Sequence, residues 1–416
     1  MFGKQFRENF LFPSDVTPLN HGSYGAVPKS VYKVYQQAIY DDLKFPDEFM
    51  FSHQSEKMVH SLKLVANLLN NDYKNLALVQ NASSGINIVF RNFPFAKGDT
   101  IIMTSIIYGA CGNTVDYVVN RYDLKLKILD IQFPTTEKAI LARFESAFEE
   151  FKSAGTGKAL SIYDTICSMP GVRMPFEKVT DLCKQYGITS CIDGAHSIGM
   201  LPIDIQKINP DFYTSNLHKW LYVPRGCAVL YVNPKFQDYI MPFPISHTYK
   251  DQPFYKRFLF YGSNNYNAFY CIEEALRFVE EDCGGFDKIR EYARQLSKGL
   301  SDYFGEDRIV KVADVSGSDL NFMVPIRVPL TEQQQKFFAT NFKDSQFDTE
   351  IRQFIENNLM TNDRTYIQFG WHNGYLYVRF SCQVYVDLDE YIWGYNEFEK
   401  ILKKFFGSEL YRKYEI

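Results

Sequence analysis

Short apolar runs alternate with amphipathic segments between about residues 75 and 232 of this chain. The apolar runs, which we expect to be strands, cover residues 99–105, 124–131, 159–166, 188–195 and 227–232. Helix-like spacing covers 140–152 and 174–187, and the second of these segments is opened by Pro175 and closed by Gly187. This alternation predicts an α/β fold with a mostly parallel sheet covered by helices.

The pattern changes after about residue 262. A long helix-like segment covers 267–282, and an αβ mixture follows that ends in YLYVRFSCQVY at 375–385. The chain has 416 residues, which is too long for one core of usual size. We therefore predict a large domain at 31–261 and a smaller α+β domain built from 1–30 and 262–416.

Charge and cysteine usage narrow the possible partners and the compartment. The net charge of −4 gives no positive field for nucleic acid or an anionic membrane surface. The sequence contains no uninterrupted apolar stretch of about 18 residues, and the N-terminal segment lacks the apolar core of a signal peptide. Eight cysteines without a CxxC pair or Cys/His cluster favour reduced thiols in the cytoplasm and predict no metal site.

Two polar segments follow neighbouring apolar runs, where a parallel sheet binds its ligands. Asp193 and His196 end one run, and Ser215, His218 and Lys219 end the next. Alone, such an Asp is more often a loop cap and such a Lys a surface residue. Together they suit pyridoxal phosphate (PLP), which needs a deprotonated amine and a carboxylate that keeps the ring nitrogen protonated.

The segments that carry these residues read DGAHSIGMLPIDI, PDFYTSNLHKW and PRGCAVLYV. They resemble the core of class V aminotransferase-like, fold-type I PLP enzymes, a group that includes cysteine desulfurases, isopenicillin N epimerase and hercynylcysteine sulfoxide lyase. The resemblance extends over most of the chain. It implies the fold-type I transferase fold, with the cofactor bound as a Schiff base on Lys219 and its ring nitrogen against Asp193.

The resemblance also implies a phosphate site. QNASSGIN at 80–87 is similar to the family's phosphate cradle, in which small residues open a helix with free N–H groups. The implied contacts are Ser83, Ser84 and Gly85, with Ser215 and His218 adding donors.

Further cofactor contacts follow from the same resemblance. Tyr108 corresponds to the aromatic ring over the cofactor, although a tyrosine after a strand is more often packing. Asp164 and Ser168 match a DHxTS-like segment, with Ser168 near the phenolic oxygen, but Thr165 replaces the usual histidine. His196 replaces a glutamine near the same oxygen, whereas a lone histidine after a strand is more often structural. Together with Lys219 and Asp193, the resemblance implies catalytic roles for His196 and Tyr108.

Substrate residues are implied at both ends of the chain. LNHGSYGAVP at 19–28 is similar to the turn that borders the substrate pocket in the epimerase-like branch, which suggests Asn20, His21 and Tyr24. Arg379 matches an RxS segment whose guanidinium binds the substrate α-carboxylate. Otherwise an arginine in a strand is usually a surface ion-pair residue.

The segment YGSNN at 261–265 is similar to a GTRD-like loop that reaches the neighbouring subunit's phosphate. Ser263 replaces the threonine hydroxyl, but Asn264 and Asn265 replace the arginine and aspartate, so only Ser263 is assigned. This implies a homodimer with shared active sites.

The sequence indicates the type of reaction less clearly than it indicates the cofactor. No cysteine lies between Cys283 and Cys382, where a desulfurase would carry its nucleophile, so we disfavour that activity. The terminal segments most resemble the epimerase-like branch, so a C–S lyase acting on a cysteine-derived amino acid is our first prediction. An epimerase or racemase and an aminotransferase remain open. A scaffold protein without cofactor is disfavoured, because it would have no need to keep Asp193, His218 and Lys219 together.

Overall fold

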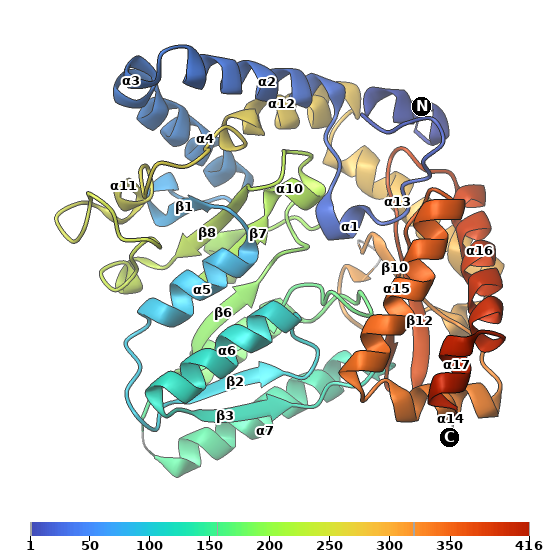
Figure 1. Ribbon diagram of the computed structural model, residues 1–416. Coiled ribbons are helices and arrows are strands. Elements are labelled where there is room, and N and C mark those ends of the chain that lie inside the picture. The colour runs from blue at the N-terminus through green and yellow to red at the C-terminus, as the bar shows by residue number, and fades with distance from the viewer. Residues whose placement is uncertain (1, 156, 319–320, 416) are drawn as a thin grey trace.

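The computed structural model describes residues 2–155, 157–318 and 321–415, and a seven-stranded sheet forms its centre (Figure 1). Only β8 runs antiparallel to its neighbours, so the predicted α/β fold with a mostly parallel sheet is confirmed. In spatial order the strands are β1 (Leu76–Val79), β8 (Ala228–Val232), β7 (Phe212–Asn216), β6 (Thr189–Asp193), β5 (Ala159–Asp164), β2 (Thr100–Thr104) and β3 (Lys125–Leu129).

Amphipathic helices cover this sheet. Helix α5 packs on β1, β7, β8 and α6, while α7 and α8 pack on each other and on β3, β5 and β6. Helix α8 lies between Pro175 and Gly187, whose φ of 67° ends it, as predicted. The helices of this part are α5 (Ala82–Asn92), α6 (Gly109–Tyr122), α7 (Glu137–Ala154), α8 (Phe176–Tyr186), α9 (Ile205–Ile208), α10 (Leu217–Trp220) and α11 (Phe254–Arg257).

A second, antiparallel sheet lies in the C-terminal part, in the order β10 (Met323–Arg327), β12 (Tyr375–Ser381), β11 (Gln368–His372). Figure 1 shows the C-terminal helices beside it. A two-stranded contact between β4 (Thr135–Thr136) and β9 (Val312–Ala313) joins it to the first part. Its helices are α13 (Phe286–Phe304), α14 (Glu332–Asn341), α15 (Ser345–Asn362), α16 (Leu388–Phe406) and α17 (Glu409–Tyr414).

The segment 267–282 is not the single long helix that we predicted. It contains a 3-10 turn (Phe269–Cys271), the short helix α12 (Ile272–Arg277) and a π turn (Phe278–Asp282). The Phe278 ring packs edge-on against Phe10 and Tyr222, with ring centroids 5.7 and 5.4 Å away. The π turn departs from regular α-helical spacing where Phe278 and Val279, two consecutive residues, are both buried.

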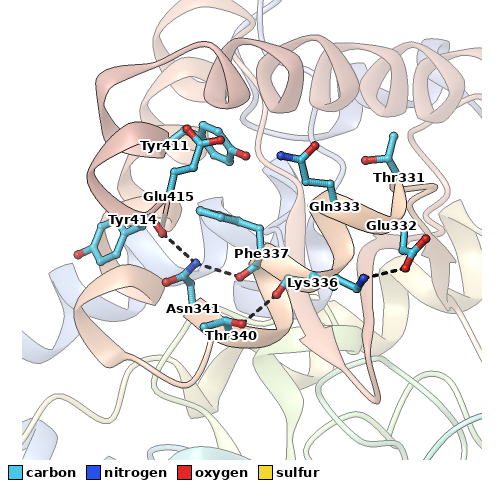
Figure 2. Close-up of a pocket in the computed structure, with 10 residues that line it drawn as sticks. All are labelled: Thr331, Glu332, Gln333, Lys336, Phe337, Thr340, Asn341, Tyr411, Tyr414 and Glu415. Atoms are coloured by element: carbon cyan, nitrogen blue, oxygen red, sulfur yellow. Dashed lines mark hydrogen bonds and ion pairs between the residues drawn. The ribbon is translucent and has the colours of Figure 1, made fainter.

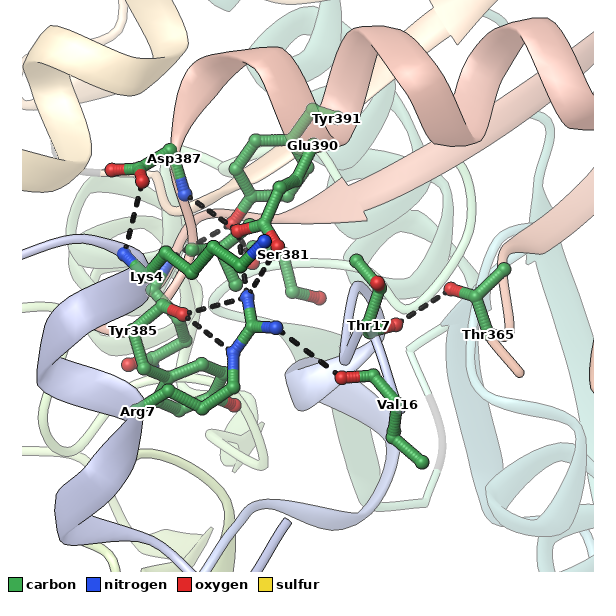
Figure 3. A network of polar contacts seen from close by, with 12 residues as sticks. Lys4, Arg7, Val16, Thr17, Thr365, Ser381, Tyr385, Asp387, Glu390 and Tyr391 are labelled. Carbon is green, nitrogen blue, oxygen red and sulfur yellow. Dashed lines mark hydrogen bonds and ion pairs between the residues drawn. The ribbon is translucent and has the colours of Figure 1, made fainter. Parts of the chain in front are cut away.

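The N-terminal segment packs against the C-terminal part of the chain. The Gly3 amide donates to the Val384 carbonyl at 2.8 Å, and Arg7 forms an ion pair with Glu390 (Figure 3). The remaining helices, α1 (His21–Tyr24), α2 (Lys29–Lys44), α3 (Pro46–Glu48) and α4 (Gln54–Leu68), follow this segment. These contacts support the proposed domains at 31–261 and at 1–30 with 262–416, a division that stays a prediction.

Within the described ranges, no helix has both the length and the apolar character needed to cross a lipid bilayer.

Candidate active site

The carboxyl ends of β5, β6 and β7 lie side by side and present polar side chains at one edge of the sheet. Strand register pairs Asp164 with Asp193, and Asp193 with Thr214. The four-residue helix α10 follows β7 directly and carries His218 and Lys219. Residues that the sequence places at separate strand ends are therefore brought together.

Lys219 is partly buried, and its surroundings favour the neutral amine. Burial, followed by the positive charge of Arg379, lowers the pKa of Lys219 to about 8, whereas the charge of Asp193 opposes the shift. The Nζ atom lies 3.1 Å from Nε2 of His196.

The protonation of His196 can be assigned from its two neighbours. The Trp220 indole can only donate, and its Nε1 lies 3.3 Å from Nδ1 of His196, so Nδ1 accepts. Burial holds the pKa of His196 well below its ordinary value, so the neutral ring carries its proton on Nε2. That proton points to Nζ of Lys219, which can accept it only as a neutral amine.

Asp193 is a buried carboxylate held by neutral donors. One oxygen accepts from the Ala195 amide at 2.9 Å, and the other accepts from the Cys111 thiol at 3.2 Å. Among the described residues no cation forms an ion pair with Asp193. A buried carboxylate in this position suits a protonated pyridine nitrogen.

Asp164 lies next to Asp193 and is also buried, and its Oδ2 has no hydrogen-bond partner in the described chain. Burial, followed by the charge of Asp193, raises the pKa of Asp164 well above its usual range. Thr165 faces the backbone, because its amide and hydroxyl approach the Asp193 carbonyl at 2.9 and 3.5 Å. Thr165 therefore supports the strand end and does not stand in for a histidine ring.

The start of helix α5 forms a small cradle. The side chain of Asn81 accepts from the amide of Ser84 at 2.8 Å, which leaves the amide of Ser83 without a partner in the described chain. A Cβ atom on Gly85 would overlap the Thr214 hydroxyl, so this glycine permits α5 to approach β7 closely. A cavity of 360 Å³ beside the cradle is lined in part by Ser83, Ser84 and Tyr261.

Ser215 and its neighbour Asn216 point to opposite faces of β7. The Ser215 hydroxyl contacts Ser197 at 3.3 Å and the Ile198 amide at 3.4 Å, not the cradle. Asn216 instead accepts from the Ala82 amide at 2.8 Å, at the first residue of α5. The structure thus brings Asn216, which the sequence analysis missed, to the cradle in place of Ser215. Side chains alternate along a strand, and that period of two was the available signal.

His218 lies beside Lys219 and donates from Nδ1 to the Cys227 carbonyl at 2.9 Å. Burial lowers its pKa to about 4. Because Nδ1 carries the proton of the neutral ring, Nε2 is unprotonated and can accept a hydrogen bond.

Arg379, in β12, is buried without an acidic partner in the described chain. Its Nη1 donates to the carbonyl and hydroxyl of Ser168, and its Nη2 donates to Asn20 at 3.1 Å and Ser23 at 3.2 Å. Its Nε has no partner there. Leaving a buried guanidinium without an anion is costly, so this site suits a carboxylate ligand. Ser168 therefore lies at the arginine, a contact that was not predicted.

The remaining predicted residues differ in exposure. His21 is buried and contacts Tyr385 and the backbone of Lys219, so it does not line an open pocket. Tyr24 is 66% exposed and Tyr108, which precedes α6, is 49% exposed. Ser263 is exposed in a loop.

A larger cavity of 730 Å³ lies elsewhere, between α14 and α17 (Figure 2). Its wall includes the ion pair of Lys336 with Glu332 and the side chain of Asn341, which bonds the Phe337 and Tyr414 carbonyls. None of the predicted site residues lines it.

Known proteins resemble this chain over most of its length. The aminotransferase class-V family model matches residues 47–334. An L-cysteine desulfhydrase-like protein of Epichloe uncinata is 28% identical, over 98% of each chain. Hercynylcysteine sulfoxide lyase of Schizosaccharomyces pombe is also 28% identical, over 97% of this chain and 98% of the relative. A solved structure of a C-DES mutant with glycine covalently linked to the PLP cofactor superposes with a TM-score of 0.70, at 16% identity, over 95% of this chain and 98% of the other.

The residues present fit PLP. The amine of Lys219 with its lowered pKa, the buried carboxylate of Asp193 and the cradle at α5 supply the three kinds of group that the cofactor requires. The predicted cofactor, pyridoxal 5'-phosphate, and the predicted fold-type I architecture are confirmed. The chain belongs to the class V aminotransferase family.

Proposed function

We propose that this protein is a PLP-dependent C–S lyase that releases the sulfur group from a cysteine-derived amino acid. The observation that carries the proposal is that Lys219, whose pKa is lowered to about 8, shares the site with the buried Arg379, which has no acidic partner in the described chain. This arrangement offers a base and a carboxylate anchor to an amino acid. The names of the two relatives matched over nearly their full length support sulfur chemistry.

The cysteines of the chain argue against a desulfurase that forms a persulfide on the protein. All eight are free and buried. Burial raises the pKa of each thiol, including Cys382, which directly follows β12. A thiolate nucleophile must be exposed and have a low pKa. Sulfur therefore leaves with the product instead of passing to a cysteine of this chain.

The roles of the residues follow from their positions. PLP, when bound, stabilises negative charge at the substrate α-carbon. Arg379 binds the substrate carboxylate and fixes which bond at that carbon can break. Lys219 takes the α-proton on Nζ, and His196, 3.1 Å away, orients that amine between substrates. Asp193 would keep the cofactor's ring nitrogen protonated, and Tyr108 would supply the aromatic contact to the bound cofactor.

The test is a panel of cysteine S-conjugates, cysteine sulfoxides and L-cysteine incubated with the purified protein and PLP. A C–S lyase should form pyruvate and a sulfur product in equal amounts. Exchange of the α-proton without pyruvate would indicate an epimerase, and transfer of the amino group to a keto acid would indicate an aminotransferase. Either of these outcomes would overturn the proposed reaction.

We also propose a homodimer with shared sites. Ser263 lies in an exposed loop directly after Tyr261, which lines the cavity beside the start of α5. This placement leaves the Ser263 hydroxyl available to a neighbouring subunit.

We further propose a cytoplasmic location, supported by eight cysteines that are all unpaired. Fractionation of cells that produce the tagged protein tests this location.

A further inference from the structure

Helix α10, which carries Lys219, is only one turn long, and this leaves its backbone in need of partners. The last carbonyls of a helix have no intrahelical donor. The Leu217 carbonyl accepts from the Leu221 amide at 3.0 Å, but the Lys219 carbonyl receives its hydrogen bond from Nε2 of His21. A side chain 198 positions away in the sequence thus fixes the backbone of the predicted catalytic lysine.

The direction of this hydrogen bond is set by the two groups around the ring. A carbonyl can only accept, so Nε2 of His21 must carry the proton. In the neutral ring Nδ1 is then the acceptor, and the Tyr385 hydroxyl donates to it at 2.6 Å. Burial lowers the pKa of His21 to about 3, which keeps this neutral arrangement at ordinary pH.

Tyr385 is itself held in place. Its carbonyl accepts from Nε and Nη2 of Arg7 at 3.2 and 3.1 Å, and Arg7 pairs with Glu390 at 2.6 Å (Figure 3). The N-terminal segment and the C-terminal helix α16 therefore both support the residue that sets the tautomer of His21.

The backbones of α1 and α10 lie too close together for one helix to shift along the other. A Cβ atom on Gly25, where φ is 70°, would overlap the His218 carbonyl. The preceding residue of His21, Asn20, accepts from Arg379 at 3.1 Å. Two consecutive residues thus hold the two basic residues of the site, Arg379 through its guanidinium and Lys219 through its backbone.

We propose that His21 is a positioning residue for Lys219, acting through the hydrogen bond from its Nε2 to the Lys219 carbonyl with Tyr385 fixing the tautomer. This role replaces the substrate contact expected of His21, and it rests on the proposed function of Lys219. The geometry supports this role, because His21 is buried and its hydrogen bond to Lys219 is to the backbone carbonyl.

Two substitutions separate the two nitrogen atoms of the ring. His21→Gln places an amide nitrogen where Nε2 lies and keeps the donor to Lys219. His21→Asn places an oxygen where Nδ1 lies and keeps only the acceptor for Tyr385. Tyr385→Phe removes the hydroxyl that sets the tautomer. Tyr395→Phe is the control, since Tyr395 is equally buried but bonds Arg308 and Glu399, away from Lys219.

The primary measurement is the pH midpoint of the visible absorbance of the cofactor-bound protein, which needs no substrate. It is accompanied by the melting temperature and by kcat/KM. We expect His21→Asn to move the midpoint and to lower kcat/KM about tenfold or more, because misplaced catalytic groups lose rate steeply. His21→Gln should keep the wild-type midpoint even if its melting temperature falls. Tyr385→Phe should move the midpoint in the same direction as His21→Asn, by less, and Tyr395→Phe should not move it.

The proposal is overturned if His21→Asn keeps the wild-type midpoint, or if His21→Gln and His21→Asn change it equally. If His21→Asn does not fold, Tyr385→Phe decides, and a midpoint equal to that of Tyr395→Phe overturns the proposal. A wild-type protein that shows the absorbance change but releases no pyruvate would instead contradict the proposed reaction and leave the role of His21 intact.

Discussion

Burial of Lys219, followed by the positive charge of Arg379, lowers the pKa of this residue and brings its neutral amine, the reactive form, within reach of ordinary pH. Since the pKa of Lys219 lies at about 8, the neutral fraction rises with pH up to that value and then levels off. The rate at which the cofactor-free protein binds PLP on Lys219 should therefore rise about tenfold per pH unit below pH 8 and flatten above it. Stopped-flow absorbance measures this rate.

Arg379→Met is the control for this profile. Removing the charge that helps to lower the pKa of Lys219 should move the midpoint to higher pH. An unchanged midpoint would mean that Arg379 does not influence the amine.

Arg379 offers a second test at the same scale. Lysine keeps the positive charge but loses the paired donors, so Arg379→Lys should lower kcat/KM for an amino-acid substrate by about tenfold or more. A comparison of the substrate with its α-carboxamide shows whether the loss concerns the carboxylate. If the wild-type enzyme accepts both equally well, Arg379 does not bind the carboxylate.

The role of a residue could be predicted from the sequence where a local motif indicates both the residue type and its position in the fold. It could not be predicted where the residue acts through a contact with a residue far away in the sequence. Asp193 and Lys219 follow from the strand ends and the resemblance. The contact from His21 to Lys219 joins segments that no local pattern relates. The ion pair of Arg7 with Glu390 joins residues that are farther apart still, at 383 positions.

At the scale of elements, the approach of α1 to α10 depends on Gly25. Its φ of 70° and ψ of −177° fall in a region that only glycine adopts freely, and a Cβ atom would also overlap the His218 carbonyl. Gly25→Ala should destabilise the protein by more than the roughly 1–2 kcal/mol of backbone strain alone, and it should weaken cofactor retention.

Gly374→Ala is the matched control, because Gly374 has a φ of 79° but open space at the position that a Cβ atom would occupy. Gly374→Ala should lose only the free energy of unfolding that backbone strain costs, and it should retain the cofactor. Denaturant unfolding and gel filtration of the loaded protein measure both effects. If both variants lost stability and cofactor equally, the contact of Gly25 with α10 would not be the cause of the loss.

Strands were the elements best predicted, because most strands of the central sheet are buried and parallel, and such strands are short apolar runs. The predicted runs contain β2, β3, β5, β6 and β8. The segment 267–282 shows the limit of the method. Its helical spacing is real, but the packing of Phe278 against Phe10 and Tyr222 comes from distant parts of the chain, and a π turn results.

At the scale of the whole molecule, the proposed homodimer predicts complementation. If Ser263 serves the partner's phosphate site, a mixture of Lys219→Ala and Ser263→Ala subunits should form dimers with one intact site and one doubly altered site. Activity of the mixture should exceed that of either parent, and light scattering should report a dimer. Full activity in a verified monomer would refute the shared site.

The central claim is that Lys219 carries the cofactor. The most direct measurement is borohydride reduction of the PLP-loaded protein, followed by digestion and mass mapping of the modified peptide. We predict one cofactor per chain, on the peptide that contains Lys219, and no modified peptide in Lys219→Ala that remains folded. The cofactor's mass on another lysine in the wild-type protein, or its persistence in Lys219→Ala at the same stoichiometry, would contradict the account.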